Sequence, residues 1–95
     1  MERLDKIIFL KDGEKLMNVR IKSTSNEIDH LFTCKNTTVF YMLEEVIYEL
    51  FPGNRQACNF FLGSGMKIDR LLNLDQNNIK DNEVILLVKQ TYIDL

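Results

Sequence analysis

Five consecutive apolar residues late in the chain, Val84-Ile85-Leu86-Leu87-Val88, constrain the fold more than any other feature. The run has the length of a β-strand and is rich in branched side chains, but both of its faces are apolar. A strand of this kind fits the centre of a sheet, with neighbours on both sides, and it suits parallel pairing. The chain must therefore bring earlier strands alongside this late segment.

Three earlier segments have strand length. Residues 16–23 alternate between apolar and polar side chains, which is typical of a half-buried strand. Residues 28–34 and 58–62 are the next two, and residues 7–10 form a further short apolar run that predicts a strand. Residues 66–78 have no clean period and are expected to be a loop with a short strand or a helical turn.

One helix is predicted between the second and third of these segments. Its apolar residues recur at three- and four-residue spacing, which indicates an amphipathic helix of about three and a half turns. The predicted buried stripe consists of Val39, Met42, Leu43, Val46, Ile47 and Leu50. Residues 36–38 (Asn-Thr-Thr) are candidate N-caps, and Pro52-Gly53 ends the helix. Phe40, Tyr41 and Tyr48 fall off the stripe and are expected to cover its flanks.

This order of elements predicts one α+β domain, with a mixed sheet of four to five strands packed on one main helix. Its expected parts are an N-terminal extension (residues 1–16) that could add a strand, the domain proper (17–90) and a short tail (91–95). One helix covers only one face of a sheet. The other face must then meet water, the N-terminal extension, another domain, a second copy or a partner.

The composition argues against several classes of function. The net charge is −2 and the 12 basic residues are scattered, so no basic patch for nucleic acid is expected. No apolar run approaches the ~20 residues needed to span a membrane, and no signal peptide is evident, which predicts an intracellular protein, cytoplasmic or nuclear. Cys34, Cys58 and His30 are too few for a zinc site or an iron–sulfur cluster, and the cysteines are expected to be buried thiols. Without a nucleophile motif or a phosphate-binding loop, we expect no enzyme and no cofactor.

Over residues 17–90 the chain resembles the ubiquitin-like family. Residues 17–22 (Met-Asn-Val-Arg-Ile-Lys) resemble the family's opening strand, and residues 31–39 its second strand and helix start. Phe61-Leu62-Gly63 resembles the turn after the third strand. Residues 74–88 are similar to the closing pattern of a leucine, an isoleucine five residues later, a polar turn and a final apolar strand. The resemblance implies a ubiquitin-like β-grasp fold.

The register of the second strand depends on Asp29. An ungapped match to the family would turn this carboxylate inward, where burial without a partner costs several kcal/mol. We therefore expect a register shifted by one residue, which buries Ile28, Phe32 and Cys34 and exchanges the two faces.

The resemblance also implies a binding surface, because family members carry a small apolar patch on the sheet face away from the helix. If Ile85 and Leu87 face the helix, their neighbours in the strand face outward. The third strand adds one outward phenylalanine, and the pattern leaves open which one. Basic residues, among them Lys89, flank the patch. The predicted partner-binding residues are Phe60, Phe61, Leu86, Val88, Arg20 and Lys22.

The implied function is that of a non-catalytic interaction domain. Its partners would be ubiquitin-binding domains, the proteasome or enzymes of the ubiquitin pathway. One alternative is a module that binds small GTPases, of the Ras-association or FERM type, through a strand edge bearing Arg20, Lys22 or Lys35. Another is an atypical ubiquitin-like modifier, although residues 89–95 contain none of the glycines with which conjugated members end.

Overall fold

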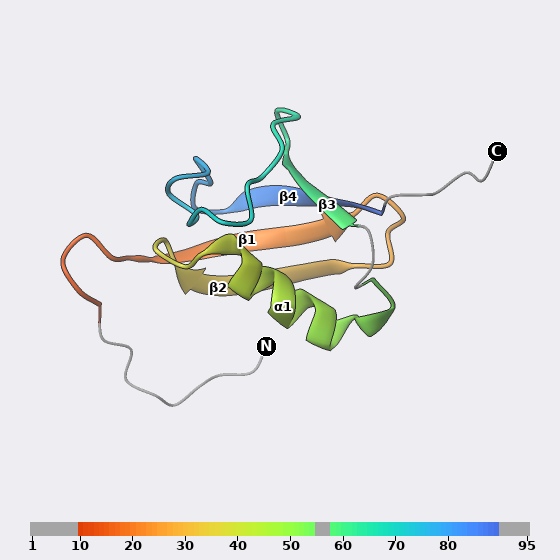
Figure 1. The fold of residues 1–95 in the computed structure, drawn as a ribbon, viewed down its shortest axis with the longest axis horizontal. Coiled ribbons are helices and arrows are strands. Elements are labelled where there is room, and N and C mark those ends of the chain that lie inside the picture. Colours follow the sequence, from red (N-terminus) through yellow and green to blue (C-terminus); the bar gives the residue numbers. More distant parts are fainter. Residues whose placement is uncertain (1–9, 55–57, 90–95) are drawn as a thin grey trace.

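The computed structural model describes residues 10–54 and 58–89, which form four strands and one α-helix (Figure 1). In chain order the elements are β1 (Leu16–Ser23), β2 (Asp29–Lys35), α1 (Phe40–Leu50), the short 3₁₀ helix η1 (Pro52–Asn54), β3 (Cys58–Leu62) and β4 (Glu83–Lys89). Of the strand predicted at residues 7–10, only Leu10 belongs to the described residues, and it is not in a strand. None of the helices in the described ranges has the length and apolar character needed to cross a membrane.

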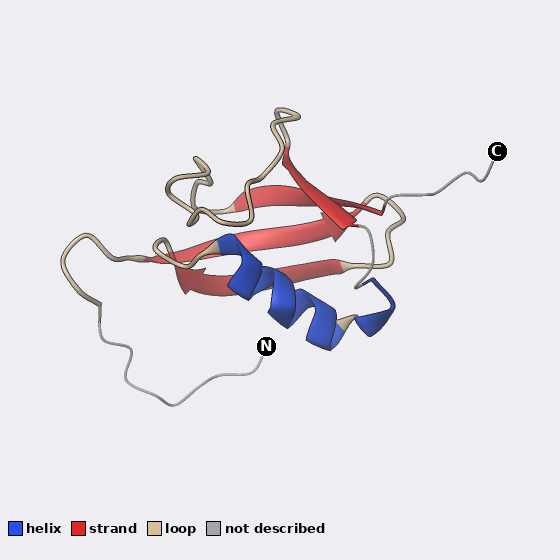
Figure 2. Ribbon diagram, in the orientation of Figure 1, coloured by secondary structure: helices blue, strands red, loops and turns tan. Residues whose placement is uncertain are grey.

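The four strands form one mixed sheet in the order β2-β1-β4-β3. β1 pairs antiparallel with β2 and parallel with β4, and β3 pairs antiparallel with β4. The apolar strand β4 therefore lies inside the sheet, between β1 and β3. This position confirms the prediction made from the apolar character of both its faces. α1 crosses one face of this sheet, and no helix of the described residues lies on the other face (Figure 2).

The register of β2 is the one that keeps Asp29 out of the core. Phe32 is opposite Val19 and Cys34 is opposite Met17 across the antiparallel pair. Phe32 is buried and Cys34 is half-buried on the helix side, whereas Asp29 is exposed. The prediction of a one-residue shift is confirmed, and its physical reason is the cost of burying a carboxylate.

The core lies between α1 and the sheet. Each fully buried apolar side chain there stabilises the fold by roughly 1.5–3 kcal/mol. The ring of Phe40 on α1 meets that of Phe60 on β3 edge to face, with 5.0 Å between centroids. The largest side chains with almost no exposure are Phe40, Phe60, Met17, Ile21, Ile28, Ile47, Leu74, Ile79, Ile85, Leu87 and Val19.

The orientation of α1 about its axis differs from the predicted one. The helix buries Phe40, Leu43, Glu44, Ile47 and Tyr48. Half of the predicted stripe is instead exposed, namely Met42, Val46 and Leu50. The reason is that Phe40 and Tyr48 form a second stripe together with Leu43 and Ile47. This second stripe brings more aromatic surface to the core than the predicted one.

The start of α1 also differs from the prediction, since no side chain caps it. Val39 is the N-cap residue and makes no side-chain cap hydrogen bond. The backbone N–H groups of Phe40 and Tyr41 instead donate to the carbonyl oxygens of Leu72 and Arg70, at 2.9 and 3.0 Å. Two backbone donors of the first turn are thus satisfied by the connection between β3 and β4, and the N–H of Met42 donates to the carbonyl of Val39.

That connection, residues 63–82, has no named helix or strand but is anchored to the core. Three of its own side chains, Ile68, Leu74 and Ile79, are buried in the core. The side chain of Asn77 is also buried and donates hydrogen bonds to three backbone carbonyls, those of Asp69, Leu72 and Asn73. These contacts make the segment an ordered part of the domain.

Candidate functional site

The alternation of β4 defines the outer face of the sheet, the one away from α1. Ile85 and Leu87 are 0% and 1% exposed and face the helix. Leu86 and Val88 lie between them on the opposite face and are half-buried. Val84 shares this face and is 41% exposed.

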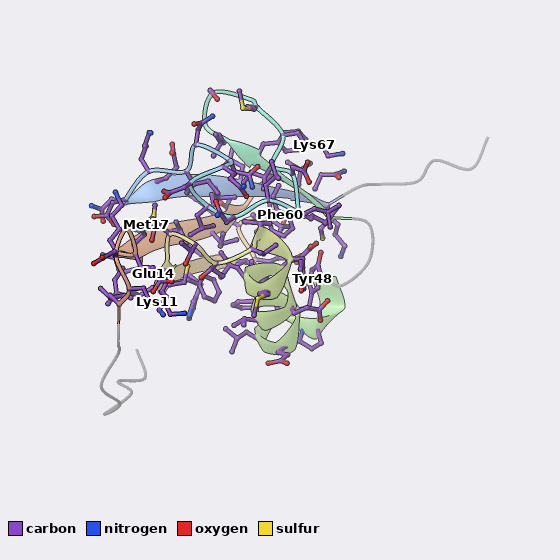
Figure 3. All side chains as sticks on the ribbon, turned by 60° about the vertical axis from the view of Figure 1, so that its left-hand side comes forward. Lys11, Glu14, Met17, Tyr48, Phe60 and Lys67 are labelled. Atoms are coloured by element: carbon purple, nitrogen blue, oxygen red, sulfur yellow. The ribbon has the colours of Figure 1, made fainter. Side chains whose placement is uncertain are left out.

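β3 contributes one phenylalanine to the outer face. Phe60 is 2% exposed and lies between the sheet and α1 (Figure 3), so its predicted role in partner binding is wrong. Phe61 points the other way, is half-buried, and is paired in register with Leu86 on β4. Phe60 shares the inner face with Cys58 and Leu62 and packs against Phe40, whereas Phe61 shares the outer face with the polar Asn59.

We define the outer-face patch as Phe61, Val84, Leu86 and Val88, four apolar side chains on β3 and β4. Val84 was not among the predicted binding residues, although the alternation of β4 that selects Leu86 also selects it. Leu31 was not predicted either; it is 47% exposed on β2 and is separated from Val84 by Arg20 of β1.

Basic residues of β1 border the patch. Arg20 is in register with Val84, and Lys22 with Leu86; both are exposed. The guanidinium of Arg20 forms an ion pair with Asp29, and this hydrogen bond lowers the pKa of the Asp29 carboxyl and raises that of Arg20. Lys89 is exposed at the end of β4. The patch is therefore apolar at its centre and mainly basic at its border.

The first described residues do not cover this face. Residues 11–15 are held at the end of the sheet, where the Asn36 side chain accepts a hydrogen bond from the Lys15 backbone and donates one to the Gly13 carbonyl. Glu14, labelled with Lys11 in Figure 3, accepts hydrogen bonds from the backbone N–H of Lys11 and from the hydroxyl of Thr37, which lies in the loop before α1. The predicted covering of the face by residues 1–16 therefore does not hold for residues 11–15.

The described residues offer little for catalysis or metal binding. No group of three or more His, Cys, Asp or Glu side chains within residues 10–54 and 58–89 is arranged to hold a metal ion. Burial raises the pKa of the thiols of Cys34 and Cys58, which disfavours the reactive thiolate. The ring of His30 packs on the rings of Phe32 and Phe51, at 4.7 and 6.1 Å.

One buried polar cluster was not expected from the sequence. The carboxylate of Glu44, on the inner side of α1, accepts hydrogen bonds from the Tyr48 hydroxyl and from Arg70 Nε, the latter at 2.7 Å. Arg70 also donates to the backbone carbonyl of Cys58. Burial and the Glu44 carboxylate raise the pKa of Tyr48 well above its ordinary value. The cluster joins α1, β3 and the following connection, which is a structural role.

Comparisons with known proteins give the fold a name. No family model matches the chain, and no curated protein matches its sequence. Among solved structures the chain is similar to a de novo designed protein based on ubiquitin, with 14% identity and a TM-score of 0.68, over 84% of this chain and 95% of that one. It is also similar to the N-terminal ubiquitin-like domain in the 4931431F19Rik protein, with 13% identity and a TM-score of 0.67, over 100% and 96% of the two chains. The four-stranded mixed sheet with one helix across it is therefore a ubiquitin-like β-grasp fold.

Proposed function

We propose that this chain is a non-catalytic interaction domain that binds partners of the ubiquitin system through the outer-face patch. The observation that carries the proposal is the common orientation of Phe61, Val84, Leu86 and Val88 on the sheet face that α1 leaves open. Exposed apolar clusters with a polar border are typical of protein-binding surfaces.

The chemistry of the patch suits a small, partly apolar partner surface. Phe61 supplies an aromatic anchor, and such residues carry much of the binding free energy when a partner buries them. Lys22 and Lys89 would attract an acidic border on the partner and speed its association. A patch of four side chains gives an interface below the standard size, so we expect rapid exchange and dissociation constants of roughly micromolar.

The proposed setting is the interior of the cell, where reducing conditions keep Cys34 and Cys58 as thiols. Within the ubiquitin system, the proposed partners are ubiquitin-binding domains, proteasome subunits or pathway enzymes that have an apolar recognition surface. This assignment rests on the fold and on the patch together, because a fold by itself does not define a function.

The alternative of a small-GTPase-binding module has less support. It requires basic side chains near a strand edge to meet an acidic partner. Two of the three candidates are already engaged, since Arg20 pairs with Asp29 and Lys35 lies 3.3 Å from a Glu14 oxygen. Binding to a nucleotide-loaded GTPase that weakens steeply with salt would favour this alternative.

The test is a titration of the full chain with a panel of ubiquitin-binding domains, followed by amide chemical shifts. We expect the largest changes in amide chemical shift at residues of β3 and β4 around Phe61 and Leu86. The substitution Leu86→Asp places a charge at the centre of the patch and should weaken binding at least tenfold, the scale of a binding hot spot.

Leu71→Asp is the matched control, because Leu71 is 78% exposed in the β3–β4 connection and is not part of the patch. It should leave affinity unchanged. Unchanged affinity in a folded Leu86→Asp variant, or shifts that avoid β3 and β4, would remove the patch from the proposal.

A further inference from the structure

The outward side of α1 carries a second apolar surface, on the opposite side of the molecule from the outer-face patch. Met42, Val46 and Leu50 are 54%, 43% and 51% exposed. Their four-residue spacing places them along one line of the helix. At about 1.5 Å of rise per residue the line is about 12 Å long, two helical turns. We call these three residues the helix row.

The composition of α1 makes this row unusual. Single exposed apolar side chains are ordinary on protein surfaces and need no explanation. Here, however, the helix buries a carboxylate, Glu44, which is 6% exposed, while three large apolar residues occupy its outward side. A sequence that breaks the rule of polar outside and apolar inside in this way does so mostly at functional sites.

The charge next to the row points to the chemistry of its ligand. Glu45 and Glu49 follow Met42 and Val46 by three residues each, so they form the adjacent line of the helix. The helix contains no lysine or arginine between residues 40 and 50. Arg70 is bound to α1 on its inner flank, where it pairs with Glu44. The helix row is therefore bordered by acidic side chains of its own helix.

These features select one class of ligand. In a second copy of this chain the same row would bring its own acidic line against Glu49, so like charges would oppose the contact. An anionic membrane surface would be repelled for the same reason. An amphipathic helix with lysine or arginine beside its apolar stripe matches α1 in two ways: its stripe can contact the helix row, and its basic residues face the acidic side chains next to that row.

We propose that the helix row of α1 binds a basic amphipathic helix of another protein, independently of the outer-face patch. The two helices would pack side by side, with Met42, Val46 and Leu50 in contact with the apolar stripe of the ligand. Glu49 would pair with a basic residue at the border of that stripe.

The experiment uses two synthetic 18-residue amphipathic helices with the full 95-residue protein. One carries a leucine stripe flanked by lysines, and the other has the same stripe flanked by glutamates. Binding is followed by fluorescence anisotropy of labelled peptide and located by amide chemical shifts. We expect the lysine peptide to bind with shifts centred on residues 41–50, and the glutamate peptide to bind at least tenfold more weakly, since its charges oppose those of Glu49.

The variant Met42→Gln/Val46→Gln removes two of the three apolar contacts and should weaken the lysine peptide about tenfold or more. Glutamine suits an exposed helix position, so the variant should keep its circular dichroism and melting temperature. Glu49→Lys tests the charge separately and should weaken the lysine peptide and reduce the salt dependence of binding. Leu31→Gln is the control and should have no effect, because Leu31 is an exposed apolar residue of β2 that belongs neither to the outer-face patch nor to the helix row.

Three results would overturn the proposal. The first is equal binding of the two peptides. The second is unchanged affinity in both the folded Met42→Gln/Val46→Gln and Glu49→Lys variants. The third is concentration-dependent dimerisation of the protein that the double substitution abolishes, because the row would then be an interface between copies.

Discussion

Neighbouring positions on α1 give the sharpest test of the fold. Val46 and Ile47 both belong to the stripe that the sequence predicts as buried, but the structure leaves Val46 43% exposed and Ile47 0% exposed. Ile47→Ala removes a side chain enclosed by the core and should cost about 2–5 kcal/mol of unfolding free energy. Val46→Ala removes little buried area and replaces a β-branched residue by the best helix former, so its effect should lie within about 0.5 kcal/mol of zero.

Urea unfolding followed by circular dichroism at 222 nm would measure both changes, since the chain has no tryptophan for fluorescence. A domain of this size has a total stability of roughly 5–15 kcal/mol, so the loss in Ile47→Ala is a large fraction of it. Its melting temperature should fall by about 8 °C or more, and that of Val46→Ala should barely move. If the two substitutions cost the same, or Val46→Ala costs more, the orientation of α1 described above is wrong, and with it the exposure of the helix row.

Two further predictions concern polar contacts. Glu44→Ala should lower the free energy of unfolding by about 1–3 kcal/mol, because it leaves the partly buried Arg70 without its carboxylate partner. In urea unfolding, the double variant Glu44→Ala/Arg70→Ala should lose less free energy than the two single variants together. Strictly additive losses would contradict the pairing. The hydrogen bond that Glu14 accepts from the Lys11 backbone, followed by that from Thr37, lowers the pKa of Glu14 from 4.5 to about 2. Since the folded pKa is depressed, this stabilisation is present above pH ~4.5 and is lost as the pH falls toward 2. Urea midpoints measured across that range should therefore fall less steeply in Glu14→Gln than in the unsubstituted protein, and parallel curves would refute the assignment.

The helix shows why sequence periodicity was insufficient there. Residues 39–50 contain two overlapping apolar stripes, one through Met42 and Val46 and the other through Phe40 and Tyr48. Only the second is compatible with the core, because Phe40 meets Phe60 and because Glu44 finds Arg70, which is 26 residues away in the chain. A local pattern cannot contain a partner at that distance.

The β3–β4 connection was the other element that the sequence left undefined. It is ordered by buried side chains and by asparagines, of which Asn78 and Asn82 adopt the left-handed backbone conformation, with φ of 59° and 65°. Asparagine reaches this region more readily than most residues other than glycine. Asparagine at these two positions is thus a turn signal in the sequence. The connection also caps α1 through the carbonyl groups of Arg70 and Leu72, a contact that leaves no trace in the sequence.

The sequence by itself determined the strand segments, the central position of β4 and the register of β2. It could do so because strand alternation has a fixed period of two and because a buried carboxylate such as Asp29 is costly. Only the tertiary structure decided which side of α1 meets the sheet and which of Phe60 and Phe61 faces outward. In α1 two apolar stripes overlap, so local hydrophobicity is balanced and contacts between distant segments determine which side is buried. In β3 the adjacent phenylalanines are equally apolar; Phe60 is the one that meets Phe40 of α1 in the core.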